Sequence, residues 1–293
     1  MSMLNINRNS LILCLVAVAI MGLSFVVLKH HAARQGTQIS KMNMVELDTE
    51  WKMYVRRRWT AEHFADQDLK AMFAAITSKD LNAVQRLLDR GISPNLSHSD
   101  GTTPLLLAFH YDIAIFRLLL SRGADPSVPI HVEFHTHGMI NPGDSVLFLS
   151  VFMDGNWFEV LTDYQFDINT RGYRDDTLMH RLIDGLISRE LKIARVNWLI
   201  DNGINLHLKN KFGDTPLYHA LKRLYGVALL EPLIENDGTP HTREEYIDML
   251  SYVRRGVKPH DNKTSGTLTT REETLQLLEN KYLSKYGEHP PLE

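Results

Sequence analysis

The sequence is poor in the residues that form covalent cross-links and in the motifs of common catalytic sites. Its 293 residues include one cysteine, Cys14, so no disulfide can form within the chain. The patterns G-x-S-x-G, H-E-x-x-H and C-x-x-C and the phosphate-binding P-loop are all missing. The net charge of -3 and the pI near 6.5 give no reason to expect nucleic-acid binding. These absences favour a binding role, with no cofactor and no small-molecule substrate.

The rest of the composition is that of an ordinary globular protein. Hydrophobic residues make up 44% of the chain and charged residues 23%, so most of the chain can bury a core. A length of 293 residues suits one large domain or two small ones.

A long uncharged segment lies near the N-terminus. Residues 11–28 read LILCLVAVAIMGLSFVVL, which is 18 residues without a charge. As a helix this segment would rise about 27 Å, close to the thickness of the hydrocarbon layer of a membrane. A core helix would normally carry a polar stripe, and this segment has none. We therefore predict a transmembrane signal-anchor over residues 10–28, preceded by a short tail over residues 1–9.

Two other interpretations of this segment remain open. A cleaved signal peptide has a shorter apolar region and a small-x-small site, for which His-Ala-Ala at residues 31–33 is a poor match. A lipidated Cys14 would need a small residue before it, where Leu13 stands. The excess of Lys and Arg after the segment, compared with Arg8 before it, leans weakly toward a cytoplasmic body.

The chain also repeats itself. GTTPLLLA at residues 101–108 returns as GDTPLYHA at residues 213–220, and residues 71–95 align with residues 104–127 so that Gly91 matches Gly123. The offset of 32 residues between these two glycines, together with the T-P-L start, resembles the ankyrin repeat. The resemblance implies an all-α fold, a solenoid of about five degenerate helix-turn-helix units.

The residues of one unit suit this fold. Thr103 can cap the first helix, and Pro104 suits its first turn because that N–H would be unpaired in any case. Gly123 can end the second helix, since a left-handed residue is needed there. The third unit ends YQFDIN at residues 164–169 and has no such glycine.

Domain boundaries follow from the repeats and from two breaks in their period. We predict a juxtamembrane linker and capping helix over residues 29–65, an ankyrin-repeat domain over 66–260 with insertions at 129–143 and 226–242, and a C-terminal capping helix and tail over 261–293.

The first insertion holds the best candidate for a metal site. His131, His135 and His137 lie in the sequence HVEFHTH, and Glu133 lies among them. Histidines two apart on a strand can share a metal ion. No fourth ligand stands at a recognised spacing, so the prediction is a polar loop without metal, with the metal site as the alternative.

The resemblance implies a concave face, formed by turn tips and first helices, that binds a protein partner. Aromatic residues and Arg are the usual anchors of such interfaces. The candidate partner-binding residues are Phe109, His110, Tyr111, Tyr173, Arg174, Phe212 and His219. His180 stands where such repeats carry a structural histidine that joins neighbouring turns.

Three hypotheses of function follow. Small bacterial proteins that combine an N-terminal anchor with degenerate ankyrin repeats include immunity proteins of type VI secretion effectors, notably lipases. The resemblance therefore suggests an immunity protein with a periplasmic body at the inner membrane. The second hypothesis is a membrane-tethered cytoplasmic scaffold or regulator, and the third is an enzyme or metal protein that uses the His131–His137 segment.

Overall fold

The computed structural model describes residues 66–291, apart from residues 100, 110, 132–140, 154, 186, 224–226 and 257–264. The predicted tail, anchor and linker lie outside the described residues, as does most of the HVEFHTH segment. Within the described part, no helix is long and apolar enough to cross a membrane. Residues from Trp59 onward form one compact unit by themselves, and the description below concerns that unit.

The described residues form helices and turns without strands, which confirms the all-α prediction. In the described part of the chain, the helices pack as six pairs of consecutive helices. These are α3 (Gln67–Thr77) with α4 (Leu81–Asp89), α5 (Pro104–Ala108) with α6 (Ile113–Ser121), α7 (Val146–Phe152) with α8 (Trp157–Leu161), α9 (Leu178–Ile183) with α10 (Arg189–Asp201), α11 (Pro216–Lys222) with α12 (Val227–Glu235), and α13 (Arg243–Gly256) with α14 (Ser265–Tyr286).

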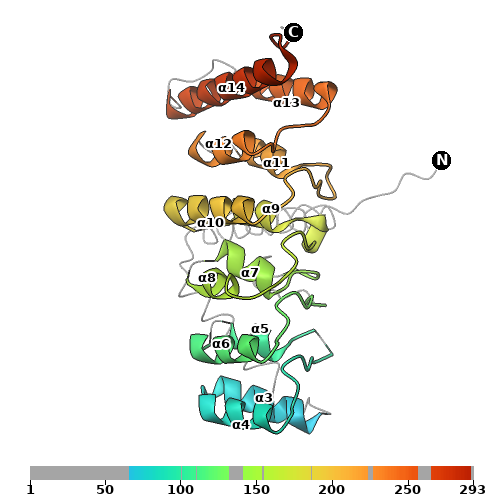
Figure 1. Cartoon of the computed structure of the whole chain (residues 1–293), viewed down its shortest axis with the longest axis vertical. Helices are drawn as coiled ribbons and strands as arrows, with labels where there is room; N and C mark the ends of the chain where they lie inside the picture. The colour runs from blue at the N-terminus through green and yellow to red at the C-terminus, as the bar shows by residue number, and fades with distance from the viewer. Residues whose placement is uncertain are drawn as a thin grey trace, which may run out of the picture. The chain divides into compact units, whose positions relative to one another are not determined.

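The pairs stack in chain order, with the first helix of each pair on the side of the connecting loops (Figure 1). Contacts join α3 to α5, α4 to α6, α7 to α9, α9 to α11, α10 to α12, and α12 to α14. Between the second and third pairs, the ring of Trp157 lies 5.1 Å from that of Phe109 and 5.2 Å from that of Phe116. A single pair cannot bury its apolar face, so the stack forms one continuous core.

The helix ends form as the sequence predicts. The Thr103 hydroxyl accepts a hydrogen bond from the Leu106 N–H at 3.1 Å, and Pro104 lies in the first turn of α5. Gly91, Gly123 and Gly203 follow α4, α6 and α10 with φ angles of 87°, 82° and 82°. Such left-handed angles favour glycine, because a Cβ would be strained there.

A turn that we call a finger precedes the first helix of four pairs. Each finger is closed by the same hydrogen bond, from the N–H of its first residue to a carbonyl just before the N-cap. The bonds are His98 N to Thr102 O at 2.8 Å, Ile130 N to Asp144 O at 2.8 Å, Gly172 N to Asp176 O at 2.9 Å, and Asn210 N to Asp214 O at 2.9 Å. The insertion predicted at residues 129–143 is thus an enlarged finger, closed at its base like the short ones.

The segment expected as a second insertion, residues 226–242, has a different structure. Most of it is helix α12, which packs on α11, α10 and α14 as the second helix of the fifth pair. Helices α13 and α14 then form a sixth pair. The sequence had predicted α13 as the end of the repeat domain and α14 as a separate C-terminal cap. Pro232 lies inside α12, and proline normally interrupts a helix, so the local sequence does not indicate this one.

Candidate protein-binding surface

Two successive fingers bring together an exposed group of aromatic and basic side chains. One finger contains the 3-10 helix η2 (Tyr173–Asp175) before α9, and the other contains Lys211 and Phe212 before α11. The Lys211 N–H donates a hydrogen bond to the Arg174 carbonyl at 2.9 Å, which fixes one finger beside the other. We call Tyr173, Arg174, Lys211 and Phe212 the fingertip cluster.

The cations of the fingertip cluster lie over its aromatic rings. The Arg174 guanidinium carbon is 4.8 Å from the centre of the Tyr173 ring and 5.5 Å from that of Phe212. The Lys211 ammonium lies 5.5 Å and 5.3 Å from the same two rings. Such cation–π contacts hold long side chains in place. Phe212 is nevertheless 59% exposed, so an apolar ring is offered to solvent.

The backbone of the first of these fingers is strained. Arg174 and Asp175 have φ angles of 62° and 56°, in the left-handed region that favours glycine. A non-glycine residue held there costs about 1–3 kcal/mol, and such residues gather at binding sites. With this backbone, the Arg174 side chain lies over Phe212 of the neighbouring finger.

The surroundings of the fingertip cluster are mainly basic. Arg171 is exposed and donates a hydrogen bond to the Lys209 carbonyl on the next finger. The Lys209 ammonium pairs with Glu245 at 2.5 Å. Arg171, Arg174, Lys209 and Lys211 thus lie on or just before two adjacent fingers, where Asp175 is the exposed acid, and the exposed Glu245 and Asp248 of α13 lie beside Lys209 only. This charge balance favours an acidic partner surface.

A cavity of about 210 Å³ lies beside the fingers. Its lining includes Lys209, Tyr218 on α11, and Glu245 and Met249 on α13. The ring of Tyr218 packs edge-on against that of Tyr252 at 5.4 Å, which fixes one wall. A partner side chain inserted here would lie between the fingers and the first helices.

The structure separates the predicted partner-binding residues. Tyr173, Arg174 and Phe212 lie together in the fingertip cluster, and Tyr111 is half-buried after α5. Phe109 is different, because it is fully buried against Phe116 and Trp157. The prediction that Phe109 binds a partner at the surface is therefore wrong.

His219 is also more enclosed than expected. Its side chain is 12% exposed, and its Nε2 lies 2.9 Å from a carboxylate oxygen of Asp184. Arg223 pairs with the same carboxylate at 3.1 Å. Although burial favours the neutral acid, the hydrogen bond and charge of His219, with the charge of Arg223, hold the pKa of Asp184 below its ordinary value. His219 therefore mainly joins α11 to α9.

His110, His135 and His137 lie outside the described residues. His131 is exposed at the base of the enlarged finger. The alternative of a metal site in HVEFHTH stays a prediction.

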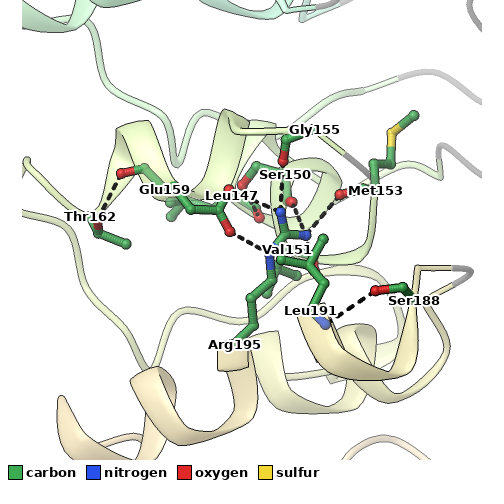
Figure 2. Close-up of polar contacts among 10 residues, drawn as sticks. All are labelled: Leu147, Ser150, Val151, Met153, Gly155, Glu159, Thr162, Ser188, Leu191 and Arg195. Carbon is green, nitrogen blue, oxygen red and sulfur yellow. Dashed lines mark hydrogen bonds and ion pairs between the residues drawn. The ribbon is translucent and has the colours of Figure 1, made fainter. Parts of the chain in front are cut away.

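Arg195 on α10 makes a buried contact that the sequence did not reveal (Figure 2). Its guanidinium donates to the carbonyls of Ser150, Val151 and Met153 at 3.1, 3.0 and 2.7 Å, and to that of Gly155 at 2.9 Å. It also pairs with Glu159 on α8 at 2.9 Å. Carbonyls at a helix end have no partner within the helix, so Arg195 supplies the donors for the end of α7.

The comparisons with known proteins agree with this architecture. Residues 29–130 match a family model described as ankyrin repeats in three copies. This part of the chain is therefore similar to ankyrin repeats. A stretch of 150 residues is also 29% identical to an ankyrin repeat protein of Fowlpox virus (strain NVSL), covering 51% of this chain and 18% of the viral protein.

The match to ankyrin repeats covers only part of the chain. It covers the whole segment predicted as a linker and capping helix, from residue 29, and it ends at residue 130, the base of the enlarged finger. The fourth and fifth pairs keep the same fingers and threonine caps, with Thr177 and Thr215 in place of Thr103. The resemblance to ankyrin repeats stated from the sequence is confirmed by the family model over residues 29–130.

Lys211 and Lys209 were missed when the sequence was read alone. Phe212 was a candidate because it is aromatic, whereas the two lysines before it carry no such signal. Their pairing with Tyr173 and Arg174 depends on two fingers lying side by side, although the repeat offset between the fingers was a usable signal.

Proposed function

We propose that this chain is a non-catalytic module that binds an acidic surface of a partner protein through the fingertip cluster. The observation that carries the proposal is the exposed Phe212 ring, flanked by Arg174 and Lys211 on two adjacent fingers. Aromatic residues beside arginine contribute most of the binding free energy at many interfaces.

We further propose that residues 10–28 anchor the chain in a membrane and that the partner is a secreted toxic effector, such as a lipase. The uncharged segment supports the anchor. A rigid stack of repeats with an exposed binding surface supports inhibition by covering an active site, which needs no chemistry from the chain itself. In this proposal the chain is a bacterial immunity protein whose body lies in the periplasm.

A membrane-tethered cytoplasmic scaffold or regulator is the second candidate. It would use the same binding surface with the opposite topology. The excess of Lys and Arg after the uncharged segment favours it.

Topology separates the two candidates. One reporter that is active only outside the cytoplasm, and another that fluoresces only inside it, would each be fused after Glu293. Activity of the outside reporter alone is expected for an immunity protein. Fluorescence of the inside reporter alone would reject periplasmic protection and leave the scaffold.

A direct test of immunity is inhibition of the enzyme encoded beside the gene for this chain. The purified full-length chain should inhibit that enzyme, and Phe212→Ala should inhibit it less. Ile113→Ala is the matched control, because Ile113 is also an exposed large apolar residue, at 39%, but begins α6. Failure of the unaltered chain to inhibit would reject the immunity proposal.

A further inference from the structure

Three side chains with metal-binding atoms meet on the turns that follow α10 and α12. His207 lies on the first turn, and Asp237 and His241 lie on the second. One ligand atom from each residue lies within 4.8 Å of those of the other two. The imidazole rings of His207 and His241 are stacked, with centres 3.5 Å apart and planes inclined by 25°. The His207 Nε2 is 3.7 Å from a carboxylate oxygen of Asp237.

The repeat places these residues on equivalent positions. After α10, Gly203 is left-handed and the Ile204 N–H donates to the Leu199 carbonyl at 3.0 Å. After α12, the Gly238 N–H donates to the Leu233 carbonyl at 2.7 Å in the same way. Gly203 therefore corresponds to Asp237, and His207 corresponds to His241, one repeat apart.

Asp237 stands where the turns after α4, α6 and α10 use glycine. Its φ angle is 64°, compared with 82° for Gly203. A non-glycine residue is uncommon in this conformation, and glycine would fit the turn without strain. Asp is one of the few side chains that tolerate this conformation, and here it places a carboxylate beside two imidazoles.

We propose that His207, Asp237 and His241 bind one divalent transition-metal ion such as Zn²⁺. Two imidazole nitrogens and one carboxylate form a common donor set for such ions. Ligands at about 2.0–2.2 Å from a tetrahedral ion lie roughly 3.4 Å from one another. The present atoms lie within 4.8 Å of one another, so metal binding would require them to move closer together. Ca²⁺ and Mg²⁺ prefer sites made of oxygen ligands, and this cluster offers one carboxylate.

The site is open on one side. The Asp237 side chain is 66% exposed and the His207 side chain 24% exposed, so water can fill the fourth position. The Lys285 ammonium on α14 lies 3.9 Å from the Asp237 carboxylate oxygen that faces away from His207, and it donates to the Pro240 carbonyl at 3.1 Å. Lys285 therefore orients the Asp237 carboxylate, but its positive charge also repels a bound cation. We therefore expect the site to bind a metal ion with moderate affinity.

The test uses the full-length chain in detergent, stripped of metal with a chelator and titrated with Co²⁺. Four-coordinate Co²⁺ has strong visible absorption bands, whereas the hydrated ion is pale. One equivalent should produce the bands, and Zn²⁺ should remove them by competition. The ion would join two successive turns, so it should also raise the unfolding temperature. Absence of a saturable band would overturn the proposal.

Matched double variants locate the site. His207→Gln with His241→Gln should weaken Co²⁺ binding by at least about tenfold, since even the loss of an outer partner has such an effect. His135→Gln with His137→Gln makes the same exchange in HVEFHTH and should leave binding unchanged. The opposite pattern would place the metal on the enlarged finger and reject the site proposed here.

Asp237→Gly separates binding from folding. It removes the carboxylate but places glycine at a left-handed position, which should leave the metal-free unfolding temperature equal or higher. Co²⁺ affinity should nevertheless fall by about tenfold or more. Unchanged affinity in this variant would remove Asp237 from the site and contradict the three-ligand arrangement.

Discussion

The Nε2 atom of His180 lies 2.9 Å from the carbonyl oxygen of Asp214, one repeat further along the chain. A carbonyl only accepts, so Nε2 carries a proton and donates it. The other ring nitrogen, Nδ1, accepts from the Thr177 N–H at 3.3 Å and lies 2.9 Å from its hydroxyl. Both nitrogens are therefore used by the neutral ring, and a second proton would break the cap of α9. The predicted structural role of His180, as a link between neighbouring turns, is confirmed.

His180 should make stability depend on pH. Burial lowers its pKa from 6.5 to about 4, and the hydrogen bond to Asp214 opposes this only in part. The unfolded chain therefore binds the proton more readily than the folded chain does. The contribution of neutral His180 is complete above about pH 6.5 and is lost as the pH falls toward about 4, to a total on the order of 3 kcal/mol.

Urea unfolding at several pH values would measure this loss. Other groups also titrate in the range, so the informative quantity is the difference between the unaltered chain and His180→Gln. The variant should be less stable at pH 7 by about 1–3 kcal/mol, because Thr177 loses its acceptor. The difference should shrink as the pH falls, and a constant difference would contradict the assigned pKa.

Removal of Arg195 should be severely destabilising. Arg195→Ala leaves the carbonyls at the end of α7 without donors and Glu159 without its partner, which should lower the free energy of unfolding by about 3–5 kcal/mol. Arg195→Lys should restore little, because one ammonium cannot reach all of these acceptors.

Arg189→Ala is the control for Arg195, since Arg189 is exposed at the start of the same helix. Its effect on urea unfolding should be within about 0.5 kcal/mol. Similar losses for the two variants would mean that the guanidinium contacts contribute little.

Phe109 should affect stability and leave the binding surface intact. Phe109→Ala removes a fully buried ring beside Phe116 and Trp157, and should cost about 3–5 kcal/mol of unfolding free energy. Partner affinity, measured where the variant is still folded, should be unchanged. A selective loss of affinity with normal stability would return Phe109 to the interface.

Phe212 and Arg174 should show the opposite behaviour. Phe212→Ala should weaken partner binding by about 10- to 100-fold with little effect on unfolding, because the ring is exposed. Arg174→Ala should weaken binding more at low salt than at high salt, since screening reduces its attraction to an acidic partner. Titration calorimetry at two salt concentrations would measure both, and salt-independent losses would argue against an acidic partner surface.

The helices were predictable from the sequence to different degrees. Thr103 with Pro104 marked α5, and Thr215 with Pro216 marked α11, because capping is a local property of the chain. Helix α12 was missed because Pro232 interrupts its local pattern, and the packing of α12 on three other helices outweighs that signal. Because α12 was not expected, α13 was assigned to the fifth pair, and the sixth pair was not predicted.

The fate of individual aromatic residues was less predictable. Phe109 and Phe212 both lie near first helices and look alike in sequence. Trp157 from the following pair covers Phe109, whereas Phe212 lies at a fingertip that no following pair covers. Burial of this kind depends on the neighbouring repeat and not on the residue itself.

The sequence by itself determined the repeat period, the capped helices and the left-handed glycines that end them, because these features depend on residues a few positions apart. Tertiary structure alone decided three other features. It brought Arg174 beside Phe212, Arg195 beneath the end of α7, and His207 against His241. Each of these contacts joins residues from successive repeats, and their geometry is set by how the repeats stack, which local sequence does not encode.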